Sequence, residues 1–510
     1  MQRCSLPSRV LAVGAALLVL LSLAPDSMAG SPKGITVVVS ATITSLDPSV
    51  ETHRSSGAVQ NTILEPLAIY DTNNALRPLL AEKWQSVDPT TWRLTLKKGV
   101  KFHDGEDFDA ESVKVAVDVF NASKGFAGSW FQFIKEVKPV DSHTVDIVTK
   151  SPTPILPQTL AFLYAFPPKY FKQVGADTFG QKPVGTGPYK FAEWVKGEYI
   201  KVKSDPTYRG GAPKIDEITF RTAPEASTRV AMLETGRADI VMNVPPQMTD
   251  RVEKAGGRVE VARTNRRVFV EYNRFDPVLQ DVRLRKAINY ATDVESIIKN
   301  LFAGRAYRAS DILRPGMPGY AKDNVKGYSY DPAKAKELMA QAGRPNGFET
   351  DLYVGVGRLM LDKELAEALV GQWEKVGIKA RLHPMEWAAF TTAAFKSDGG
   401  KGMMPGMHIL SHAPMWWDAD YTWQNHFWSK ATWKYAHTPK GDQMFEAQRT
   451  EVDPQKRAAL EQALEKHWVD EECGWNILYD QQDIYGVAKR LKWKARLDEL
   501  MTFEEASIIE

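Results

Sequence analysis

Two aspartates, Asp418 and Asp420, lie in the most tryptophan-rich segment of the chain, which runs from residue 415 to residue 433 and holds five of the 14 tryptophans. Paired carboxylates are the groups with which glycosidases cleave a glycosidic bond. Large aromatic side chains with a few polar groups between them are also what a ligand-binding wall requires, because they supply apolar area and a few orienting contacts. Aromatic residues that only fill a core give the same pattern. The segment by itself leaves catalysis, ligand binding and core packing open.

Three histidines close to this segment could contribute to a metal site. His408 and His412 are four residues apart, and His426 follows within the tryptophan-rich segment. Pro405 and Pro414 indicate that the two earlier histidines do not share one regular helix, so the spacing does not place them on one helical face. We therefore expect no metal and no cofactor.

Motifs for other hydrolytic or nucleotide-dependent chemistry are absent from the sequence. It contains no G-x-S-x-G elbow, no H-E-x-x-H pair and no C-x-x-C. The glycines at 185 and 187 lack the spacing and the lysine of a phosphate-binding loop, and Pro188 follows them directly. An exported hydrolase remains an alternative, without a motif to support it.

The N-terminus has the composition of a secretory signal peptide. Arg3 and Arg9 precede an apolar run over residues 10–21, and small residues lead to a predicted cleavage after Ala29. The run is too short to span a membrane, and Cys4 precedes it, so Cys4 is not a lipoprotein cysteine. The prediction is a periplasmic protein whose residues 1–29 are removed. Cys473 is then the single cysteine left, so no intramolecular disulfide can form.

Charge and length narrow the class of protein further. The chain has 65 basic and 63 acidic residues, and loss of the signal peptide leaves 63 and 62. This balance gives no electrostatic reason to expect nucleic acid or an anionic membrane as partner. The 481 remaining residues suggest about three domains.

The first half of the chain is rich in predicted strands, and the second half in predicted helices. Alternating or β-branched patterns predict strands at residues 35–39, 91–97, 144–149, 199–203, 215–222 and 267–273. Apolar periodicity with cap residues predicts helices starting after Asp109, near residue 229, over residues 282–302, after Asp331, over residues 363–376 and after Asp453. Strand character returns at residues 477–487, which suggests that the last segment completes a sheet begun earlier.

Seven blocks spread along the chain occur together in one known family. They are T-S-L-D-P at 44–48, E-P-L at 65–67, L-L-A-E-K-W at 79–84, G-V-K-F-H-D-G at 99–105, P-V-G-T-G-P-Y-K-F at 183–191, D-V-R-L-R-K-A-I at 281–288 and Q-W-E-K-V-G-I at 372–378. In this order the blocks resemble the peptide/nickel/opine class of extracytoplasmic solute-binding proteins, which includes dipeptide- and oligopeptide-binding proteins and serves ABC importers. The resemblance covers residues from about 35 to about 495.

The resemblance implies an α/β fold of the periplasmic binding protein type, with two lobes joined by a hinge and an additional inserted domain. Lobe I would comprise residues 30–68, 185–273 and 481–510, the inserted domain residues 69–184, and lobe II residues 274–480. Ligand would bind between the lobes, which close around it. No bond is made or broken in such a protein, so no catalytic residues are expected.

The resemblance also implies a set of ligand-binding residues. The segment Ala419-Asp420-Tyr421 matches the one whose aspartate pairs with a ligand amine in peptide binders. Arg358 lies near the place of an arginine that meets a ligand carboxylate in dipeptide binders, although its spacing from the helix at Gln372 and Trp373 differs by a couple of residues. The full predicted set is Asp420, Trp417, Trp416, Tyr421, Trp423, Asp418, Arg358, Ser45 and Leu46.

The resulting prediction is a monomer that captures a peptide or peptide-like, amine-bearing solute for the permease and ATPase subunits of an ABC importer. The family often has a proline shortly after the A-D-Y segment, whereas this chain has Thr422 and Trp423. A metal chelate, an opine or an oligosaccharide therefore remains an alternative ligand, and presentation of the ligand to a membrane receptor an alternative role.

Overall fold

The computed structural model describes residues 33–71, 74–395, 404–414, 416–431, 433, 435–496 and 499–509. The signal peptide predicted over residues 1–29 lies outside these ranges. Among the described residues, no helix combines the length and the apolar character needed to cross a bilayer.

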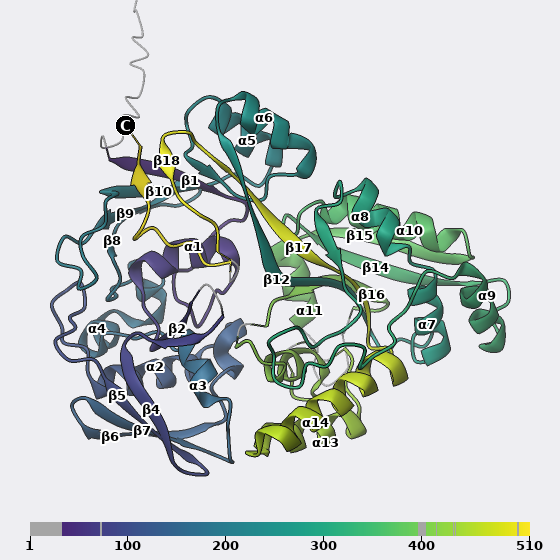
Figure 1. Ribbon diagram of the computed structural model, residues 1–510, viewed down its shortest axis with the longest axis horizontal. Helices are drawn as coiled ribbons and strands as arrows, with labels where there is room; N and C mark the ends of the chain where they lie inside the picture. Colours follow the sequence, from purple (N-terminus) through teal and green to yellow (C-terminus); the bar gives the residue numbers. More distant parts are fainter. Residues whose placement is uncertain are drawn as a thin grey trace, which may run out of the picture.

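An 11-stranded mixed sheet extends across the whole molecule (Figure 1). Its strand order is β15-β14-β16-β12-β17-β11-β1-β10-β9-β8, and β13 pairs with β17. The strands are β1 (Gly34–Val39), β8 (Tyr189–Val195), β9 (Tyr199–Ser204), β10 (Glu217–Thr222), β11 (Ile240–Val241), β12 (Arg258–Tyr272), β13 (Ala306–Arg308), β14 (Phe348–Val356), β15 (Ile378–Glu386), β16 (Met407–His412) and β17 (Trp475–Val487).

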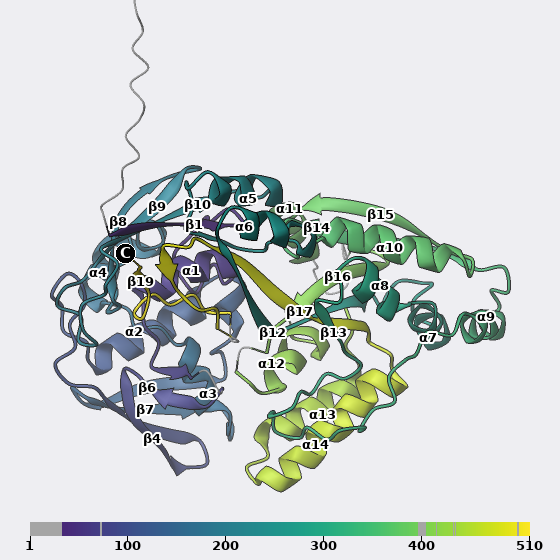
Figure 2. The same cartoon turned by 45° about the horizontal axis from the view of Figure 1, so that its top comes forward.

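Two long antiparallel strands, β12 and β17, connect the two halves of this sheet (Figures 1 and 2). At one end β17 pairs with β11, and further along β12 pairs with β16. The prediction that the last strand completes a sheet begun earlier is therefore confirmed. The register of the β12–β17 pair shifts between Arg263 and Arg267. Such a bulge bends a strand and changes the direction of its side chains.

A separate four-stranded sheet, in the order β4-β5-β7-β6, lies within the predicted inserted domain. Its strands are β4 (Ala81–Asp88), β5 (Thr91–Leu96), β6 (Ile134–Asp141) and β7 (Thr144–Thr149), and its helix is α2 (Ala110–Ala122). Asp109 caps α2 as predicted, because its side chain accepts hydrogen bonds from the amides of Glu111 and Ser112. Smaller elements of this region are β2 (Ala68–Tyr70), β3 (Leu76–Pro78), α3 (Leu156–Thr159) and α4 (Pro168–Phe179).

Most of the remaining helices lie in the second half of the chain. They are α1 (Arg54–Ile63), α5 (Ala226–Glu234), α6 (Thr249–Lys254), α7 (Val282–Tyr290), α8 (Val294–Asn300), α9 (Pro332–Gln341), α10 (Asp362–Glu374), α11 (Trp387–Phe395), α12 (Asp420–Thr422), α13 (Pro439–Thr450) and α14 (Pro454–Lys466). The single helix predicted over residues 282–302 is wrong. Helix α7 ends at Tyr290, with Ala291 as its C-cap. The side chain of Asp293 then accepts a hydrogen bond from the amide of Ser296, and α8 begins there as a separate helix.

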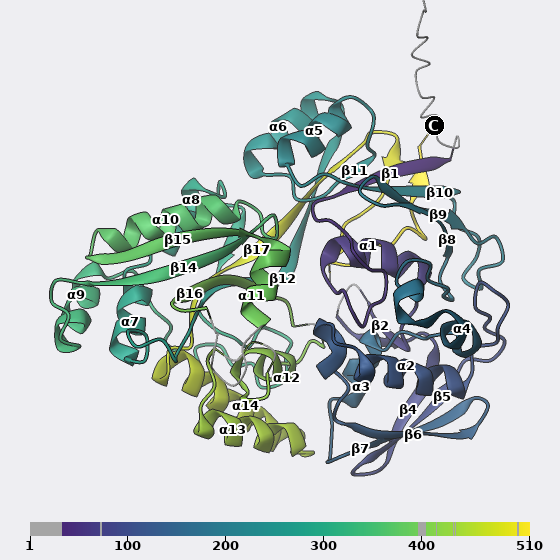
Figure 3. The ribbon, with the colours of Figure 1, turned by 180° about the vertical axis from the view of Figure 1, so that it is seen from behind.

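The observed architecture agrees with the predicted α/β class: one mixed sheet runs through two lobes, and a separate four-stranded sheet forms an additional region (Figure 1). Seen from behind, α1 lies on one side of the crossing strands and α11 on the other (Figure 3). The exact domain boundaries remain predictions.

Candidate functional site

A cavity of about 1390 Å³ lies between segments that are far apart in the sequence. One wall comes from the loop before α1, from α1 itself and from the inserted domain. The opposite wall comes from the loop after β14, from the start of α11 and from the end of β16. Residues 499, 500, 502 and 504, near the C-terminus, add to the lining on the side of α1. The volume exceeds the usual range for small-molecule sites, about 300–1,000 Å³, so the cavity has room for a short peptide.

The part of the wall nearest the inserted domain is largely apolar. It is formed by Leu64, Ile69, Tyr70, Leu79, Trp130, Phe162 and Tyr164. An apolar wall of this kind can bury hydrophobic parts of a ligand but gives little orientation. The orienting groups lie elsewhere on the wall.

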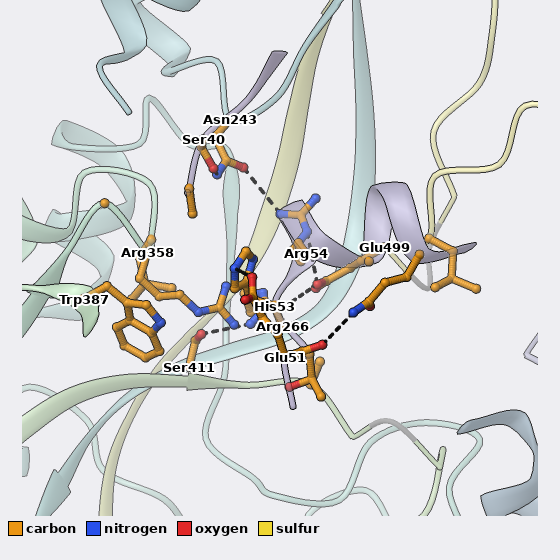
Figure 4. Close-up of a pocket in the computed structure, with 18 of the residues that line it drawn as sticks. Ser40, Glu51, His53, Arg54, Asn243, Arg266, Arg358, Trp387, Ser411 and Glu499 are labelled. Carbon is orange, nitrogen blue, oxygen red and sulfur yellow. Dashed lines mark hydrogen bonds and ion pairs between the residues drawn. The ribbon is translucent and has the colours of Figure 1, made fainter. Parts of the chain in front are cut away.

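Four arginines line the cavity, and one of them, Arg229, donates its hydrogen bonds to main-chain carbonyls. Arg54, the first residue of α1, is the first of the other three (Figure 4). Its guanidinium forms an ion pair with Asp483 of β17 and donates a 2.6 Å hydrogen bond to the hydroxyl of Tyr485. Burial opposes the charge of Arg54, but Asp483 and the other neighbours hold its pKa above the ordinary value. Arg54 is thus a permanently charged group that already has an internal partner.

Arg266, the second arginine, lies within the bulge of β12. Its guanidinium donates a 3.0 Å hydrogen bond to the hydroxyl of Ser411 and forms an ion pair with Glu499 (Figure 4). Glu499 also lies 3.3 Å from Nε of Arg54. Although burial works against a charged carboxylate, Arg266 and Arg54 hold the pKa of Glu499 below its usual value.

Arg358, the third arginine, follows β14 and projects over the ring of Trp387, with 5.4 Å between the guanidinium carbon and the ring centroid. It is partly buried. Within the described ranges its guanidinium has no hydrogen bond or ion pair to another side chain. Burial, together with the nearby charge of Arg266, lowers its pKa to about 9, so it remains protonated at neutral pH. Arg358 therefore presents to the cavity a positive charge that forms no ion pair within the described residues.

The loop that carries Arg358 is held by Asp362, the first residue of α10. The Asp362 carboxylate accepts hydrogen bonds of 3.1 Å and 3.2 Å from the amides of Arg358 and Leu359. Burial raises the pKa of Asp362 to about 6. Asp362 thus fixes the backbone from which Arg358 reaches into the cavity.

Of the nine side chains predicted to bind ligand, Arg358 and Tyr421 line the cavity. Tyr421 stacks on His412 at 4.8 Å between ring centroids and packs edge-on against Trp130 and Trp416 at 5.8 Å and 5.0 Å. The structure therefore places the predicted carboxylate partner, and one predicted wall residue, at the cavity.

The two aspartates of the tryptophan-rich segment are fully buried and form ion pairs with helices α13 and α14. Asp420 is 3.0 Å from the guanidinium of Arg449 and accepts a 3.0 Å hydrogen bond from Gln448. Asp418 forms a bidentate pair with Arg457, with both distances at 2.7 Å. Neither aspartate is among the residues that line the cavity. The role of Asp420 as partner of a ligand amine stays a prediction.

The other predicted residues are not among those that line the cavity. Trp416 and Trp423 are fully buried in hydrophobic clusters, and the indole of Trp423 donates to Glu461 at 2.5 Å. Trp417, in the left-handed region at φ 48°, lies against Gly316. Ser45 donates its amide to Glu51, and Leu46 is buried. In the same loop, Thr42 and Thr44 line the cavity instead.

Sequence reasoning missed Arg54, Arg266, Ser411 and Glu499 as cavity residues. A signal for Arg266 was present, because Arg266 and Arg267 directly precede the apolar run Val268-Phe269-Val270 of a predicted strand. A charged residue inside a buried strand requires a partner. No local pattern identifies Glu499, whose partners are more than 230 residues away in the sequence.

Two of the three histidines, His412 and His426, are joined to each other, while His408 is buried apart from them. His412 lies on strand β16, 3.2 Å from His426, which in turn bonds to Glu271 at 3.0 Å. Burial and the nearby positive charges lower the pKa of His412, so it is neutral at pH 7. In the part of the chain that the structure describes, no three His, Cys, Asp or Glu side chains are placed to hold a metal ion.

Comparison with known proteins gives the family. The model for bacterial extracellular solute-binding proteins, family 5 (middle), matches residues 75–434. The chain is 30% identical to the glutathione-binding protein GsiB of Pectobacterium atrosepticum over 506 residues, which cover 95% of this chain and 96% of that protein. The chain belongs to family 5 of the bacterial extracellular solute-binding proteins.

Solved structures agree with this fold. DppA from Helicobacter pylori, in complex with the peptide STSA, superposes with a TM-score of 0.83 at 22% identity, covering 94% of this chain and 98% of that one. AgaA from A. tumefaciens R10, in complex with agropinic acid, gives 0.81 at 25% identity, with 94% and 99% covered.

Family 5 proteins bind solutes for ABC importers and are not enzymes. The prediction of a solute-binding protein without catalytic residues is therefore confirmed, and the alternative of an exported hydrolase is discarded. Members of the family work with the permease and ATPase components of ABC importers.

Proposed function

We propose that this family 5 protein captures a peptide or peptide-like solute in the periplasm. The guanidinium of Arg358 binds a carboxylate of that solute. The observation that carries the proposal is the guanidinium of Arg358, which forms no ion pair within the described residues, in the wall of a cavity of about 1390 Å³. A planar guanidinium with free N–H groups matches a carboxylate with two parallel hydrogen bonds. The aromatic face of Trp387 restricts its orientation before ligand arrives.

The relatives support a ligand of this class. GsiB is named for glutathione, a tripeptide that carries carboxylates, and DppA holds a tetrapeptide. The apolar wall around Trp130 and Phe162 would accept peptide side chains. We further propose that the protein acts as a monomer after cleavage near Ala29.

An opine is the second candidate, because AgaA holds agropinic acid. Peptides and opines both carry a carboxylate that Arg358 could bind. The residue that would bind an amine of the ligand is a separate question, for which Asp420 and Glu386 are the candidates. Asp420 would have to leave Arg449 and Gln448 to reach an amine, whereas Glu386 is exposed on the cavity wall beside Trp387. We therefore include Glu386 as an amine partner in the proposal.

Native mass spectrometry of gently purified protein tests the proposal, because closed binding proteins retain their ligand. A bound peptide mass is expected, and a metal-bearing or sugar mass would contradict it. Calorimetric titration with glutathione, a tetrapeptide and agropinic acid should then identify the class. C-terminally amidated forms of the bound peptides are the matched control, and we expect them to lose most of the affinity.

A further inference from the structure

Three of the four arginines of the cavity wall, Arg54, Arg266 and Arg358, form a cluster and differ in how the chain itself neutralises them. Arg54 has Asp483, and Arg266 has Glu499, while the guanidinium of Arg358 has no carboxylate partner among the described residues. The cluster consists of these three arginines with Asp483 and Glu499, so its formal net charge is +1. One further anion would neutralise the cluster.

Glu499 differs from Asp483 in the way it reaches the cluster. Asp483 lies on β17, in the middle of the sheet, whereas Glu499 comes from the C-terminal segment that follows β18 (Leu491–Lys492). Its backbone has φ 64°, a left-handed conformation that is unfavourable for a residue with a side chain. Its side chain is 7% exposed, and Oε1 is buried without a hydrogen-bond partner.

These features are costly for the fold. A left-handed backbone costs about 1–2 kcal/mol, and a buried carboxylate with an unpaired oxygen adds a desolvation cost. Local strain of this kind, at a site that faces a ligand cavity, points to a role in binding rather than in stability. The carboxylate of Glu499 occupies the position at which Arg266 and Arg54 would otherwise attract an anion.

Two other carboxylates of the wall, Glu51 and Asp362, have partners of their own. Glu51 accepts the amides of Thr44 and Ser45 and pairs with His53. Asp362 accepts amides of its own loop. Glu499 is therefore the carboxylate that decides whether Arg266 is available to a ligand.

We propose that Glu499 sets the charge of the ligand that this cavity accepts. It satisfies Arg266 and Arg54 from within the chain, and it leaves Arg358 to bind a single carboxylate. Ligands with one carboxylate at this place are accepted, and a second adjacent negative charge is repelled by Glu499. The inference rests on the proposed function, because it takes Arg358 as the anion-binding residue.

The test uses small anions as probes, so it does not depend on the natural ligand. Thermal unfolding of the mature protein is followed with sodium acetate and with sodium malonate at equal ionic strength, since salt screens charge. In the Glu499→Gln variant, Arg266 and Arg358 are both free, and the Kd for malonate should fall by about tenfold or more relative to the wild type. The response to acetate should change by less than about threefold.

Two further variants separate this effect from a general loss of charge. Glu504→Gln removes a carboxylate of the same C-terminal segment that also lines the cavity, and it should respond to both anions like the wild type. The double variant Glu499→Gln/Arg266→Gln restores the net charge of the cluster and should lose the gain in malonate binding. If Glu499→Gln is unstable in chloride, malonate but not acetate should restore its thermal transition.

Equal malonate binding by the wild type and Glu499→Gln, or an equal gain in Glu504→Gln, would overturn the proposal. So would an unstable Glu499→Gln variant that malonate does not restore. A protein that binds no peptide or opine can still show the malonate gain, so failure of the proposed function is distinguished from failure of this inference.

Discussion

Tyr70 and Trp416 are 346 positions apart in the sequence, and the hydroxyl of Tyr70 donates a 2.6 Å hydrogen bond to the main-chain carbonyl of Trp416. Two more contacts lie nearby. Gln424 donates to the carbonyl of Ser129 at 3.2 Å, and Tyr421 packs edge-on against Trp130. The tryptophan-rich segment therefore joins the predicted lobe II to the predicted inserted domain across the cavity, rather than forming most of the ligand wall.

Removal of the Tyr70 hydroxyl should weaken closure of the two halves. The variant Tyr70→Phe leaves the buried carbonyl of Trp416 without its donor, which costs about 1–3 kcal/mol. We expect the bound ligand to dissociate about fivefold faster or more, as measured by stopped-flow fluorescence of the tryptophans. Tyr199→Phe, which removes an exposed hydrogen bond to Glu193, is the control and should not change the rate. An unchanged rate in Tyr70→Phe would show that this contact does not hold the closed form.

Replacement of Arg358 should abolish binding without destabilising the fold. The variant Arg358→Gln removes the charge that meets the ligand carboxylate, at a cost of about 2–5 kcal/mol of binding free energy, or at least about 30-fold in Kd. Isothermal titration with the ligand found by mass spectrometry measures this loss. Arg283→Gln removes a surface arginine paired with Asp281 and should retain full affinity. Retained affinity in Arg358→Gln would remove the basis of the proposed function.

Replacement of Asp420 separates a structural role from a ligand-binding role. The variant Asp420→Asn leaves the guanidinium of Arg449 without a charged partner in a buried site, and loss of one member of a buried pair costs about 3–5 kcal/mol. We expect a lower free energy of unfolding in urea and an unchanged Kd for the folded protein. Unchanged stability with loss of amine-bearing ligands would instead support the sequence-based prediction that Asp420 meets a ligand amine.

The stability of the protein should depend on pH through Asp362. Burial raises its pKa from 3.8 to about 6 in the folded protein. The folded state therefore binds this proton more tightly than the unfolded state, so its contribution to stability is present below about pH 4 and is lost as pH rises through about 6.

The variant Asp362→Asn cannot titrate and should flatten this part of the pH profile. A shift of this size corresponds to at most about 3 kcal/mol between pH 4 and pH 7. Urea unfolding of both proteins over this range measures the difference. Asp118→Asn, at an exposed ion pair with Lys114, should follow the wild-type profile. Parallel profiles for the wild type and Asp362→Asn would contradict the prediction.

Local sequence was sufficient for elements whose signals lie within a few residues. Asp109 and Asp331 were identified as helix caps, and their side chains accept the amides of the first turn as expected. The helix predicted over residues 282–302 failed because the apolar periodicity continues through Asp293, whereas the carboxylate of Asp293 starts a second helix. The sequence alone does not distinguish an aspartate that caps a new helix from one inside a longer helix. The structure distinguishes them, because the Asp293 side chain bonds to the amide of Ser296.

The sequence by itself indicated the family and the fold class, and it singled out Arg358, which the structure places in the cavity wall. These follow from short blocks and from residues whose neighbours are close in the chain. Only the tertiary structure decided the partners of the buried charges. Asp420 pairs with Arg449, Arg266 pairs with Glu499, and Arg358 forms no ion pair within the described residues. The physical reason is that a charged side chain is available to a ligand only when the fold leaves it without an ion pair. The side chains that could pair with it lie up to hundreds of residues away in the sequence, so only the tertiary structure shows which pairs form.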